Sequence, residues 1–429
     1  MPPLMGSIGA DSAKAYGFTS VVIAPTYYMA YYGTTNGTNL YYACNDSAGA
    51  TYGAGYNATA SRPYFWKVSS TGDVLSWQKT YDVALTRGVS TLYDGSNIWF
   101  GTTAGVFKVN PSTGSMIFAG RANSITFVYK MVLSGTSLFL FGNFTGVGYG
   151  GVAKMDVSSG LSTALFQYSY ATSAPSSTQS GFFSGGIDSS GNIICVGFTG
   201  TSGVVMKLPP NSSTATWTRN HTISGQTNFQ YYSVAIDSSD NMYVVGVSFR
   251  TASGSDAMLT KLNSSGTVQW SKSLKNSTTV SDSFQDVTLD PSQNYLYAVG
   301  STASNSVLIA KFDLSGNLIF QRTLDFLAGS TGWSIQVDSN SMYIGARAAR
   351  SGLSQNFTAR LPNDGSKTGT YSLGGSNVVY ASSSLTLTDE TLTVSTSAFA
   401  AIGSASGATA ITTSWTSLAY TVFQNTTIP

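Results

Sequence analysis

The chain has 429 residues, of which only 9% are charged, and its formal net charge is +2. Lys and Arg form no cluster, so the composition excludes the basic surface that nucleic-acid binding requires. No apolar run approaches the roughly 18 residues that indicate a membrane span. The many aromatic residues and glycines are typical of strands joined by tight turns.

Residues 1–19 precede the first strand-like segment and are rich in Gly, Ala and Ser. We expect them to form an extended docking arm. They lack a basic segment followed by an apolar one, so no secretory signal is predicted. The composition is nevertheless typical of a protein that works outside cells. A virion protein, made in the host cytoplasm and released by lysis, satisfies both observations.

Residues 20–373 contain a motif that recurs seven times, marked by a basic residue near the end of a short apolar segment. The gaps between these residues run from 41 to 54 positions. A period of roughly 40–50 residues with several strands per unit predicts a β-propeller. The marker residues are Lys67, Lys108, Lys154, Lys207, Lys261, Lys311 and Arg360.

The clearest copy, Tyr232–Leu274, divides into four strands joined by short polar turns. Seven copies therefore predict an all-β ring of seven four-stranded antiparallel blades. We expect the first strand of blade one near Tyr27–Tyr32 and its second strand at LYYAC, residues 40–44. The last blade should end near Leu373, with Tyr371 in its fourth strand. No strand then needs to be borrowed from the other end of the chain, and a C-terminal strand swapped into the ring is the alternative.

Three further positions recur within the motif. Glycine ends the second strand, which suits a bulge or a close backbone approach, at Gly101, Gly142, Gly197, Gly246, Gly300 and Gly345; Cys44 stands near this place in the first copy. Glycine also precedes the fourth strand, where a turn needs positive φ, at Gly72, Gly114, Gly160, Gly266, Gly316 and Gly365. Aromatic residues expected to pack between blades are Trp77, Phe118, Phe166, Trp217, Trp270, Phe320 and Tyr371.

Residues 374–429 fall outside the period and contain no Lys or Arg. Alternating runs such as SLTLTDETLTVSTS predict a Ser/Thr-rich β extension. It would pack on the propeller or on a partner subunit, with a loose tail as the alternative. The two cysteines, Cys44 and Cys195, are assigned to corresponding strands of different blades. We therefore expect two buried thiols and no disulfide.

The recurring charges are interpreted as structural. The cations lie on the third strand rather than on the channel-lining first strand, and we expect them to pair with an aspartate at the end of the first strand. DSSGN and DSSDN superficially resemble the start of a calcium loop, but a hydrophobic strand follows at once and turn formation explains the aspartate. The aspartates are Asp94, Asp188, Asp237, Asp290 and Asp338.

No catalytic, cofactor-binding or metal-binding residue is predicted. His221 is the only histidine and is expected in a surface loop after a fourth strand. The glycine run Gly146–Gly151 lies between strands, not before a helix that could receive a phosphate. A glycosidase would need a pair of carboxylates, for which the loop acids Asp256, Asp282 and Asp325 are the candidates, although nothing in their spacing supports this.

Two segments carry resemblances to known proteins. The block AMLTKLNSSGTVQWSKSL, echoed by VLIAKFDLSGNLIFQRTL, resembles the bacterial β-propeller repeat over roughly residues 20–373. That resemblance implies a fold and says almost nothing about activity. The segment DSAKAYGFTS and the Ser/Thr-rich C-terminal strands resemble the termini of tail-associated virion proteins from phages, especially those of marine bacteria.

The leading interpretation is a non-enzymatic bacteriophage virion protein, tail-associated in a fibre, nozzle or baseplate, with a role in host attachment. Its terminal segments would dock on other virion proteins in a symmetric homo-oligomer. A capsid decoration protein is one alternative. Another is a carbohydrate-binding adhesin that reads a host surface glycan through loops such as Thr51–Ser61 and Thr172–Gly181. A lyase or glycosidase on the same scaffold is a third.

Overall fold

The computed structural model describes most of the chain from residue 26 onward. The stretches outside the description are 1–25, 34–37, 58–61, 82–87, 104, 123–124, 145–149, 159–163, 172–179, 251–253, 277–279, 327–328, 351–352, 397–399, 405–407, 411–414 and 418–421. The predicted docking arm, residues 1–19, thus lies outside the described residues. All regular structure in the described part consists of strands, and none of it is a helix able to cross a membrane.

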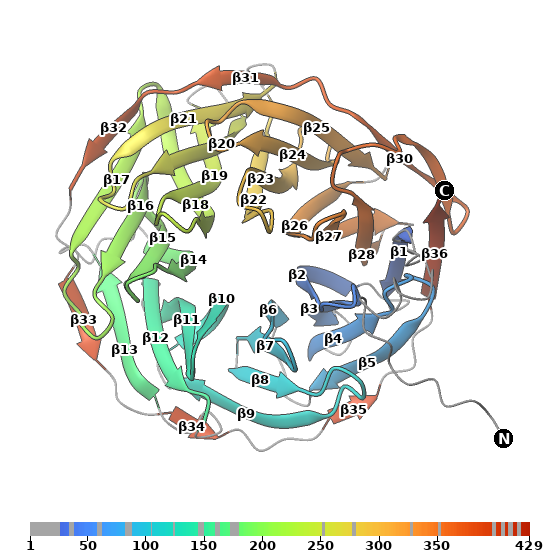
Figure 1. Cartoon of the computed structure of the whole chain (residues 1–429), viewed down its shortest axis with the longest axis horizontal. Coiled ribbons are helices and arrows are strands. Elements are labelled where there is room, and N and C mark those ends of the chain that lie inside the picture. The colour runs from blue at the N-terminus through green and yellow to red at the C-terminus, as the bar shows by residue number, and fades with distance from the viewer. Residues whose placement is uncertain are drawn as a thin grey trace, which may run out of the picture.

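Seven four-stranded antiparallel blades form a ring around a central channel, which confirms the predicted seven-bladed β-propeller (Figure 1). In each blade the first strand lies nearest the channel. Blade one is β2 (Thr38–Asn45), β3 (Thr51–Asn57), β4 (Arg62–Val68) and β5 (Leu75–Tyr81); blade two is β6 (Gly88–Tyr93), β7 (Ile98–Thr102), β8 (Val106–Val109) and β9 (Met116–Ala122); blade three is β10 (Ile125–Ser134), β11 (Ser137–Phe144), β12 (Gly150–Asp156) and β13 (Ala164–Ala171). Blade four is β14 (Ser180–Ile187), β15 (Ile193–Thr199), β16 (Ser202–Leu208) and β17 (Trp217–Ile223); blade five is β18 (Gln226–Ile236), β19 (Met242–Arg250), β20 (Ser255–Leu262) and β21 (Val268–Lys275); blade six is β22 (Ser283–Leu289), β23 (Tyr295–Ser301), β24 (Val307–Asp313) and β25 (Leu318–Asp325).

Blade seven combines strands from two distant parts of the chain. It contains β26 (Ser330–Val337), β27 (Ser341–Arg350), β28 (Leu353–Pro362) and β1 (Tyr27–Gly33), whose Tyr28 pairs with Arg360. The expectation that Tyr27–Tyr32 begins blade one is therefore wrong, because this segment is the outer strand of the last blade. Tyr371, expected in that place, lies in β29 (Gly369–Leu373), which pairs elsewhere.

This exchange shifts the strands of blade one by one position. LYYAC, expected as the second strand, belongs to the channel strand β2, and Thr51–Asn57, expected in an exposed loop, is the buried strand β3. Cys44 and Cys195 consequently lie in a first and a second strand, not in corresponding ones. Both thiols are buried and free, as expected.

The middle strands of a blade are buried on both faces because another blade lies on each side. In β19 the first seven residues are all buried, whereas β21, nearer the rim, alternates between buried and exposed positions. This explains why the second strands read as continuous apolar runs. Seven hydrophobic clusters, each formed by two neighbouring blades, hold the ring together.

Aromatic residues of the outer strands pack on the turn glycines of the next blade. A Cβ added to Gly114 would lie 2.8 Å from Trp77, and one added to Gly365 would lie 2.9 Å from Phe320. At Gly72 the aromatic neighbour is Tyr28 of β1, which takes the place predicted for Tyr371. These turn glycines have φ of +67° to +84°, as predicted, and Gly160 lies outside the described residues.

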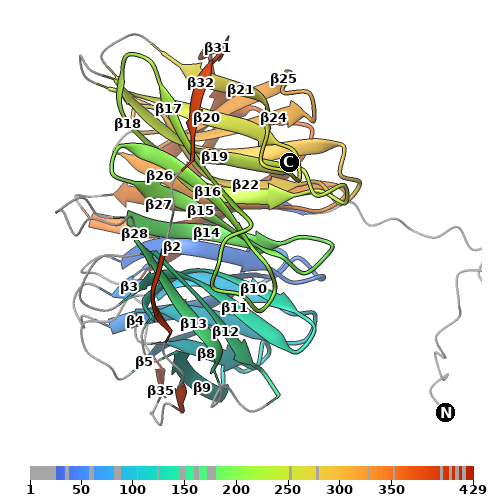
Figure 2. The ribbon, with the colours of Figure 1, turned by 90° about the vertical axis from the view of Figure 1, so that its left-hand side faces the viewer.

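A belt of seven strands from the C-terminal extension encircles the ring (Figures 1 and 2). Each belt strand pairs antiparallel with the outermost strand of one blade, in the order six, five, four, three, two, one and seven. Of the alternatives for residues 374–429, the described strands therefore show packing within the same chain. The belt is β30 (Ser376–Ser382), β31 (Thr386–Asp389), β32 (Leu392–Ser395), β33 (Ala400–Ser404), β34 (Ala408–Ala410), β35 (Trp415–Ser417) and β36 (Val422–Ile428).

The first and last strands place both described chain ends on one face of the ring. Tyr27, which starts β1, pairs with Ile428, which ends β36, and both lie where β28 ends. Since β26, β27 and β28 are antiparallel in turn, the inner strand β26 begins on the opposite face. We call these the terminal face and the distal face; in Figure 2 the C-terminus lies toward the right.

Candidate binding pocket in the central channel

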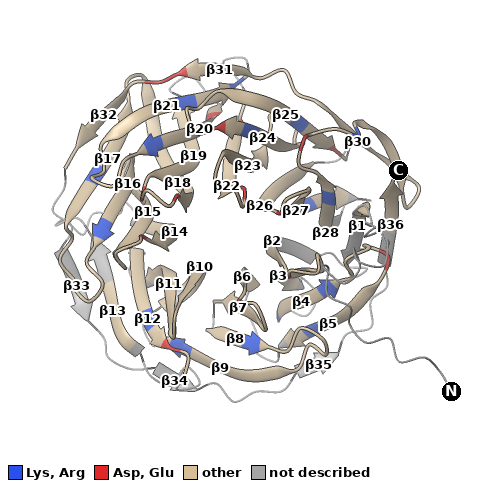
Figure 3. Cartoon of the chain, in the orientation of Figure 1, with Lys and Arg blue, Asp and Glu red and all other residues tan. Residues whose placement is uncertain are grey.

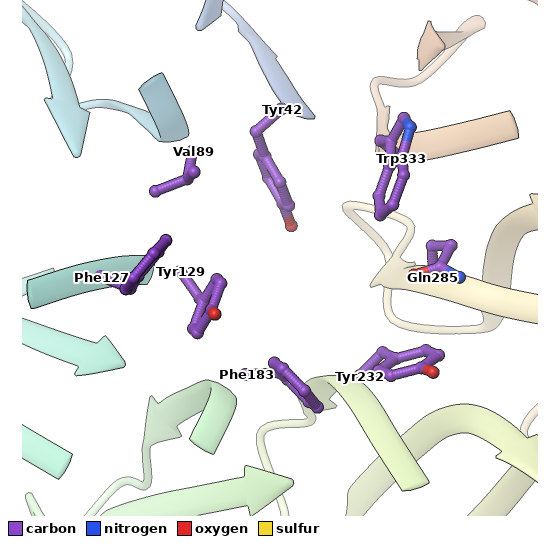
Figure 4. A pocket seen from close by; sticks show the side chains of 8 residues that line it. All are labelled: Tyr42, Val89, Phe127, Tyr129, Phe183, Tyr232, Gln285 and Trp333. Carbon is purple, nitrogen blue, oxygen red and sulfur yellow. The ribbon is translucent and has the colours of Figure 1, made fainter. Parts of the chain in front are cut away.

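A cavity of about 380 Å³ lies within the central channel, and all seven blades contribute side chains to its wall. Most of these side chains are aromatic and only half-buried, so they present surface to the cavity. Figure 4 shows them arranged around a shared space. The wall residues are Tyr42, Val89, Phe127, Tyr129, Phe183, Tyr232, Gln285 and Trp333.

A β-bulge at the same place in every inner strand positions the wall. In blade six the pairing passes from Phe284–Gly300 to Asp286–Val299, which leaves Gln285 without a partner in the ladder. Such a bulge re-aims a side chain. The same shift releases Val89, Tyr129, Phe183, Tyr232 and Trp333 in their blades, and Tyr41, next to Tyr42, in blade one.

The recurring glycines of the second strands make room for these bulges. A Cβ on Gly197, Gly246 or Gly300 would lie 1.8–1.9 Å from a carbonyl oxygen of the inner strand. The close backbone approach predicted from the sequence is confirmed. In blade one the corresponding residue is Gly55, which pairs with Leu40 just before the bulge, and not the position of Cys44.

Neighbouring rings in the wall meet edge to face. The centroids of Tyr129 and Phe183 are 5.3 Å apart at 68°, and those of Phe183 and Tyr232 are 5.3 Å apart at 67°. This is a favourable geometry for aromatic pairs, so the wall holds its shape without a ligand. Burial raises the pKa of Tyr232 to about 12, so its hydroxyl remains protonated at neutral pH.

A polar layer crosses the channel directly beneath the wall, formed by Tyr42, Lys130, Ser233 and Asp286. The Lys130 ammonium donates to the Tyr42 hydroxyl at 2.7 Å and lies 3.9 Å from Asp286 Oδ1. Asp286 also accepts from the Ser233 hydroxyl at 2.6 Å and from the backbone N–H of Ile335 at 3.1 Å. Burial and then the Asp286 carboxylate raise the pKa of Tyr42 well above its usual value.

The polar layer lies on the terminal-face side of the cavity. Lys130, Ser233 and Asp286 each follow a bulge residue by one position, and the inner strands run from the distal to the terminal face. The cavity is therefore bounded below by hydrogen-bonded polar groups and is approached from the distal face. Such a site can hold a small ligand between aromatic faces, with amide and phenol groups to orient it.

The marker cations make structural contacts within the blades, and three of them lie beside the aspartates predicted as their partners; Figure 3 shows Lys and Arg positions along third strands such as β4 and β8. Lys207 lies 2.7 Å from Asp188, while Lys108 and Arg360 each lie 3.8 Å from their predicted aspartates. Six of the cations lie over the aromatic ring that faces them on the second strand, at 4.9–5.5 Å from its centroid: Lys67, Lys108, Lys154, Lys261, Lys311 and Arg360.

The recurring aspartates form turns, which confirms the simpler interpretation of DSSGN. Asp188 Oδ1 accepts from the backbone N–H groups of Ser190 and Asn192 at 3.0 and 2.8 Å. Burial alone would raise the pKa of Asp188, but hydrogen bonds from Lys207 and Asn192 outweigh it and lower the pKa overall. Within the described ranges, no three His, Cys, Asp or Glu side chains gather closely enough to hold a metal ion.

His221 is a core residue, so the surface-loop expectation is wrong. It lies within β17, is fully buried, and shares a hydrogen bond of 2.7 Å with Tyr231 through Nδ1. Burial, and then the nearby Arg219, lower the pKa of His221 to about 4. The strand continues past the aromatic Trp217 for six more residues because β32 of the belt pairs with its second half.

Of the three acids considered as a glycosidase pair, Asp256 and Asp282 lie on neighbouring segments, since Ser255 and Ser281 form a β-bridge, but each is engaged in structural contacts. Asp256 is buried and paired with Arg250, and Asp282 accepts from the backbone N–H groups of Asn276 and Ala303. Asp325 lies at the rim in β25, where it pairs with Val379 of the belt.

The described residues of the other candidate segments contribute nothing to the cavity wall. Gly150 and Gly151, expected between strands, are the first residues of β12, while 145–149 fall outside the described residues. Of the two loops considered for sugar binding, 172–179 also lie outside the description, and Thr51–Asn57 is a buried strand.

Sequence reasoning missed the cavity although a signal exists. In six blades the bulge residue stands five positions before the aspartate that ends the inner strand, as in Phe183 and Asp188 or Trp333 and Asp338; in blade three Ser134 takes the place of the aspartate. The residue types at this place vary, so a search for a conserved letter overlooks them. Alignment on the aspartate would have collected them, and would also have placed Asp46 and the strands of blade one correctly.

No family model and no curated protein matches the chain. Among solved structures, a catalytically inactive virginiamycin B lyase from Staphylococcus aureus with quinupristin is 10% identical, with a TM-score of 0.51 over 78% of this chain and 99% of that one. The WD40 β-propeller domain of Doa1 is 11% identical, with a TM-score of 0.49 over 78% and 96%. Kuenenia stuttgartiensis hydrazine synthase is 12% identical, with a TM-score of 0.48 over 65% and 78%. At this identity the likeness to the lyase supports the propeller fold and assigns no activity.

Proposed function

We propose that the chain is a non-enzymatic structural protein of a bacteriophage virion, associated with the tail as part of a fibre, nozzle or baseplate. The propeller would act as a rigid body in host attachment, and the terminal segments would dock on other virion proteins. A symmetric homo-oligomer is the expected form, because repeated copies of one chain assemble most simply by closed symmetry.

The observation that carries this proposal is the belt. A particle exposed outside cells depends on slow unfolding, since nothing refolds its parts. The belt covers the outer edge of every blade, and exposed sheet edges are where a β protein pairs with other chains. The ring achieves this without a disulfide, because both cysteines are free. Both described ends lie on the terminal face, which suits a module docked by its ends.

Immunogold electron microscopy on particles from a lysate that contains the protein tests the proposal. Antibodies against the ring are expected to place gold at the tail. Gold over the head would instead support the capsid decoration alternative. Unlabelled particles, with the epitope shown to be accessible by labelling the purified chain, would contradict a virion role.

The channel cavity favours carbohydrate binding as a second function, compatible with the first. A half-buried aromatic wall with a glutamine and several phenols is the kind of surface on which sugars stack and form hydrogen bonds. Host attachment through a surface glycan would use this site rather than the loops considered from the sequence.

A further inference from the structure

The channel cavity has features that define its ligand more narrowly than carbohydrate in general. Three features are independent of one another. The cavity is bounded on one side, the charges in its polar layer cancel, and its wall is aromatic with a few polar groups. Each restricts the chemistry that fits, and together they point to one class of ligand.

The first restriction is the boundary. The polar layer joins blades one, three, five, six and seven across the channel. An extended ligand could therefore pass from the distal to the terminal face only by breaking these hydrogen bonds. A ligand that enters from the distal face therefore presents an end. At about 380 Å³ the cavity is near the lower limit of small-molecule sites, which are roughly 300–1,000 Å³.

The second restriction is charge. Lys130 and Asp286 are paired, so the polar layer presents no net charge to a ligand in the cavity. An anionic sugar would have to draw Lys130 away from Asp286 and leave a buried carboxylate unpaired, which is costly. A quaternary ammonium ligand is disfavoured as well, because the Lys130 ammonium already lies 4.8 Å from the centroid of the Tyr42 ring.

The third restriction is the wall itself. Trp333, Phe183 and Tyr232 offer ring surface for the C–H face of a pyranose. The Tyr232 hydroxyl donates to Gln230 and the Gln285 amide donates to Ser283, so both add oxygen atoms that can accept hydrogen bonds from a ligand. A purely apolar ligand would desolvate these groups without replacing their hydrogen bonds. A neutral sugar satisfies both kinds of surface.

We propose that the channel cavity binds the terminal neutral hexose of a glycan, with Trp333 as the stacking platform and Gln285 as a hydrogen-bonding partner. The proposal rests on the attachment role argued above, and it adds an orientation. The cavity faces the distal side, while Tyr27 and Ile428 lie on the terminal side. A particle-bound copy docked by its ends would present the cavity outward, toward a host surface.

The test begins with a glycan array probed with the full chain, followed by calorimetric titration of the best neutral mono- or disaccharide. Trp333→Ala is expected to weaken binding at least tenfold, and Trp333→Phe to weaken it less because a ring remains. Tyr295→Ala serves as the matched control, since Tyr295 is an exposed aromatic residue outside the cavity wall. Its affinity should equal that of the unmodified chain. Thermal melts establish that each variant is folded.

Three outcomes would overturn the proposal: no binding to any neutral sugar at millimolar concentration, binding only to charged sugars or to choline, or binding that survives Trp333→Ala. These results are independent of the particle experiment. A chain that labels the tail but binds no neutral sugar keeps the virion role and loses this site. A chain that binds a sugar through Trp333 but labels no particle keeps the site and loses the virion role.

Discussion

Six of the seven marker cations connect their blade to the next through a single hydrogen bond. Lys67 donates to the carbonyl oxygen of Pro111 at 3.1 Å, in the turn of blade two that precedes its outer strand. Lys261 and Lys311 make the same kind of contact to Leu314 and Asn363. Arg360 completes the circuit by donating to Ser70 of blade one at 3.3 Å. A residue on the third strand is therefore placed to fix the rotation of one blade against its neighbour.

His221 predicts a specific dependence of stability on pH. The unfolded chain takes up a proton at this residue near pH 6.5, whereas the folded chain does so only near pH 4. The contribution of His221 to stability therefore falls as the pH is lowered from about 6.5 to 4, and then stays constant. Since one pKa unit corresponds to about 1.4 kcal/mol, the shift is worth roughly 3 kcal/mol. Urea unfolding of the unmodified chain and His221→Gln across this range measures it.

His221→Gln is the matched variant because glutamine can still accept the hydrogen bond from Tyr231 but does not titrate. Its free energy of unfolding should depend less steeply on pH between 4 and 6.5. Equal slopes for the two proteins would show that His221 is not the titrating group. Below pH 4 both should lose stability alike, as aspartates with lowered pKa values, such as Asp188 and Asp237, become protonated.

Residue-level prediction from the sequence succeeded where one residue type recurs and failed where it varies. The turn glycines repeat the same letter, and their role was predicted correctly; of the recurring cations, Lys108, Lys207 and Arg360 lie beside the predicted aspartates. The cavity wall uses Val, Tyr, Phe, Gln and Trp at one position, because a bulge fixes the direction of the side chain and leaves its chemistry open. His221 was misplaced because its burial depends on a distant belt strand.

At the scale of the element, the inner-strand bulge and the facing glycine act as a unit. Gly246→Ala would place a Cβ 1.9 Å from the carbonyl oxygen of Gln230, so β18 must shift or lose its bulge beside Tyr232. We expect a loss of roughly 1–3 kcal/mol, as for other overpacked sites. Chemical unfolding measures the loss, and the same variant should bind the cavity ligand more weakly.

The control for this variant is Gly369→Ala in β29. There an added Cβ would meet its nearest neighbour, the Tyr371 hydroxyl, at 3.4 Å, which is an ordinary contact. This variant should unfold at the same denaturant concentration as the unmodified chain. A Gly246→Ala variant as stable as the control would show that the inner strand does not need the glycine.

Strand identity was predicted well and strand partnership poorly, for a physical reason. Alternation and apolar runs are local, and they marked most strands of blades two to six. The pairing of β1 with β28 and β36 joins segments from opposite ends of the chain, and no local pattern encodes it. The Tyr-rich β1 therefore looked like an inner strand, although its Tyr28 packs on Gly72 in the manner of an outer-strand aromatic.

At the scale of the whole molecule, β36 is the element whose loss should matter most to the ring. Deleting Val422–Pro429 would remove all seven pairings that cover the outer edge of β1. With a net contribution near 1 kcal/mol for each hydrogen bond, offset by chain entropy, we expect a loss of roughly 3 kcal/mol. Calorimetry should show a lower Tm, and hydrogen exchange should accelerate in β1 and β28.

The control for this deletion changes β32, the belt strand that pairs with blade four. Replacing the apolar side chains of β32 (Leu392→Ser, Val394→Ser) leaves the ring closure untouched, so exchange in β1 should stay slow. If deletion of β36 left exchange in β1 and β28 unchanged, the belt would not be what holds blade seven closed.

The number of blades followed from the sequence because a closed array repeats its unit, and seven markers gave seven blades. The path of the belt around the ring could not be predicted from the sequence. Its strands are short, and they contain no repeated letter that matches the blades they cover. Their order around the ring is set by where the chain leaves blade seven, through β29 and β30, onto the rim of blade six.

The closure of blade seven also determines when during synthesis the ring can be completed. β1 leaves the ribosome before any other described strand, yet its first partner, β28, follows more than 300 residues later. At 5–20 residues per second that interval lasts tens of seconds. During this interval both edges of the segment YYMAYYG are unpaired. The segment has no charged residue that would disfavour pairing with other chains. Every molecule therefore completes its ring in competition with aggregation, and the outcome depends on translation speed as well as on equilibrium stability.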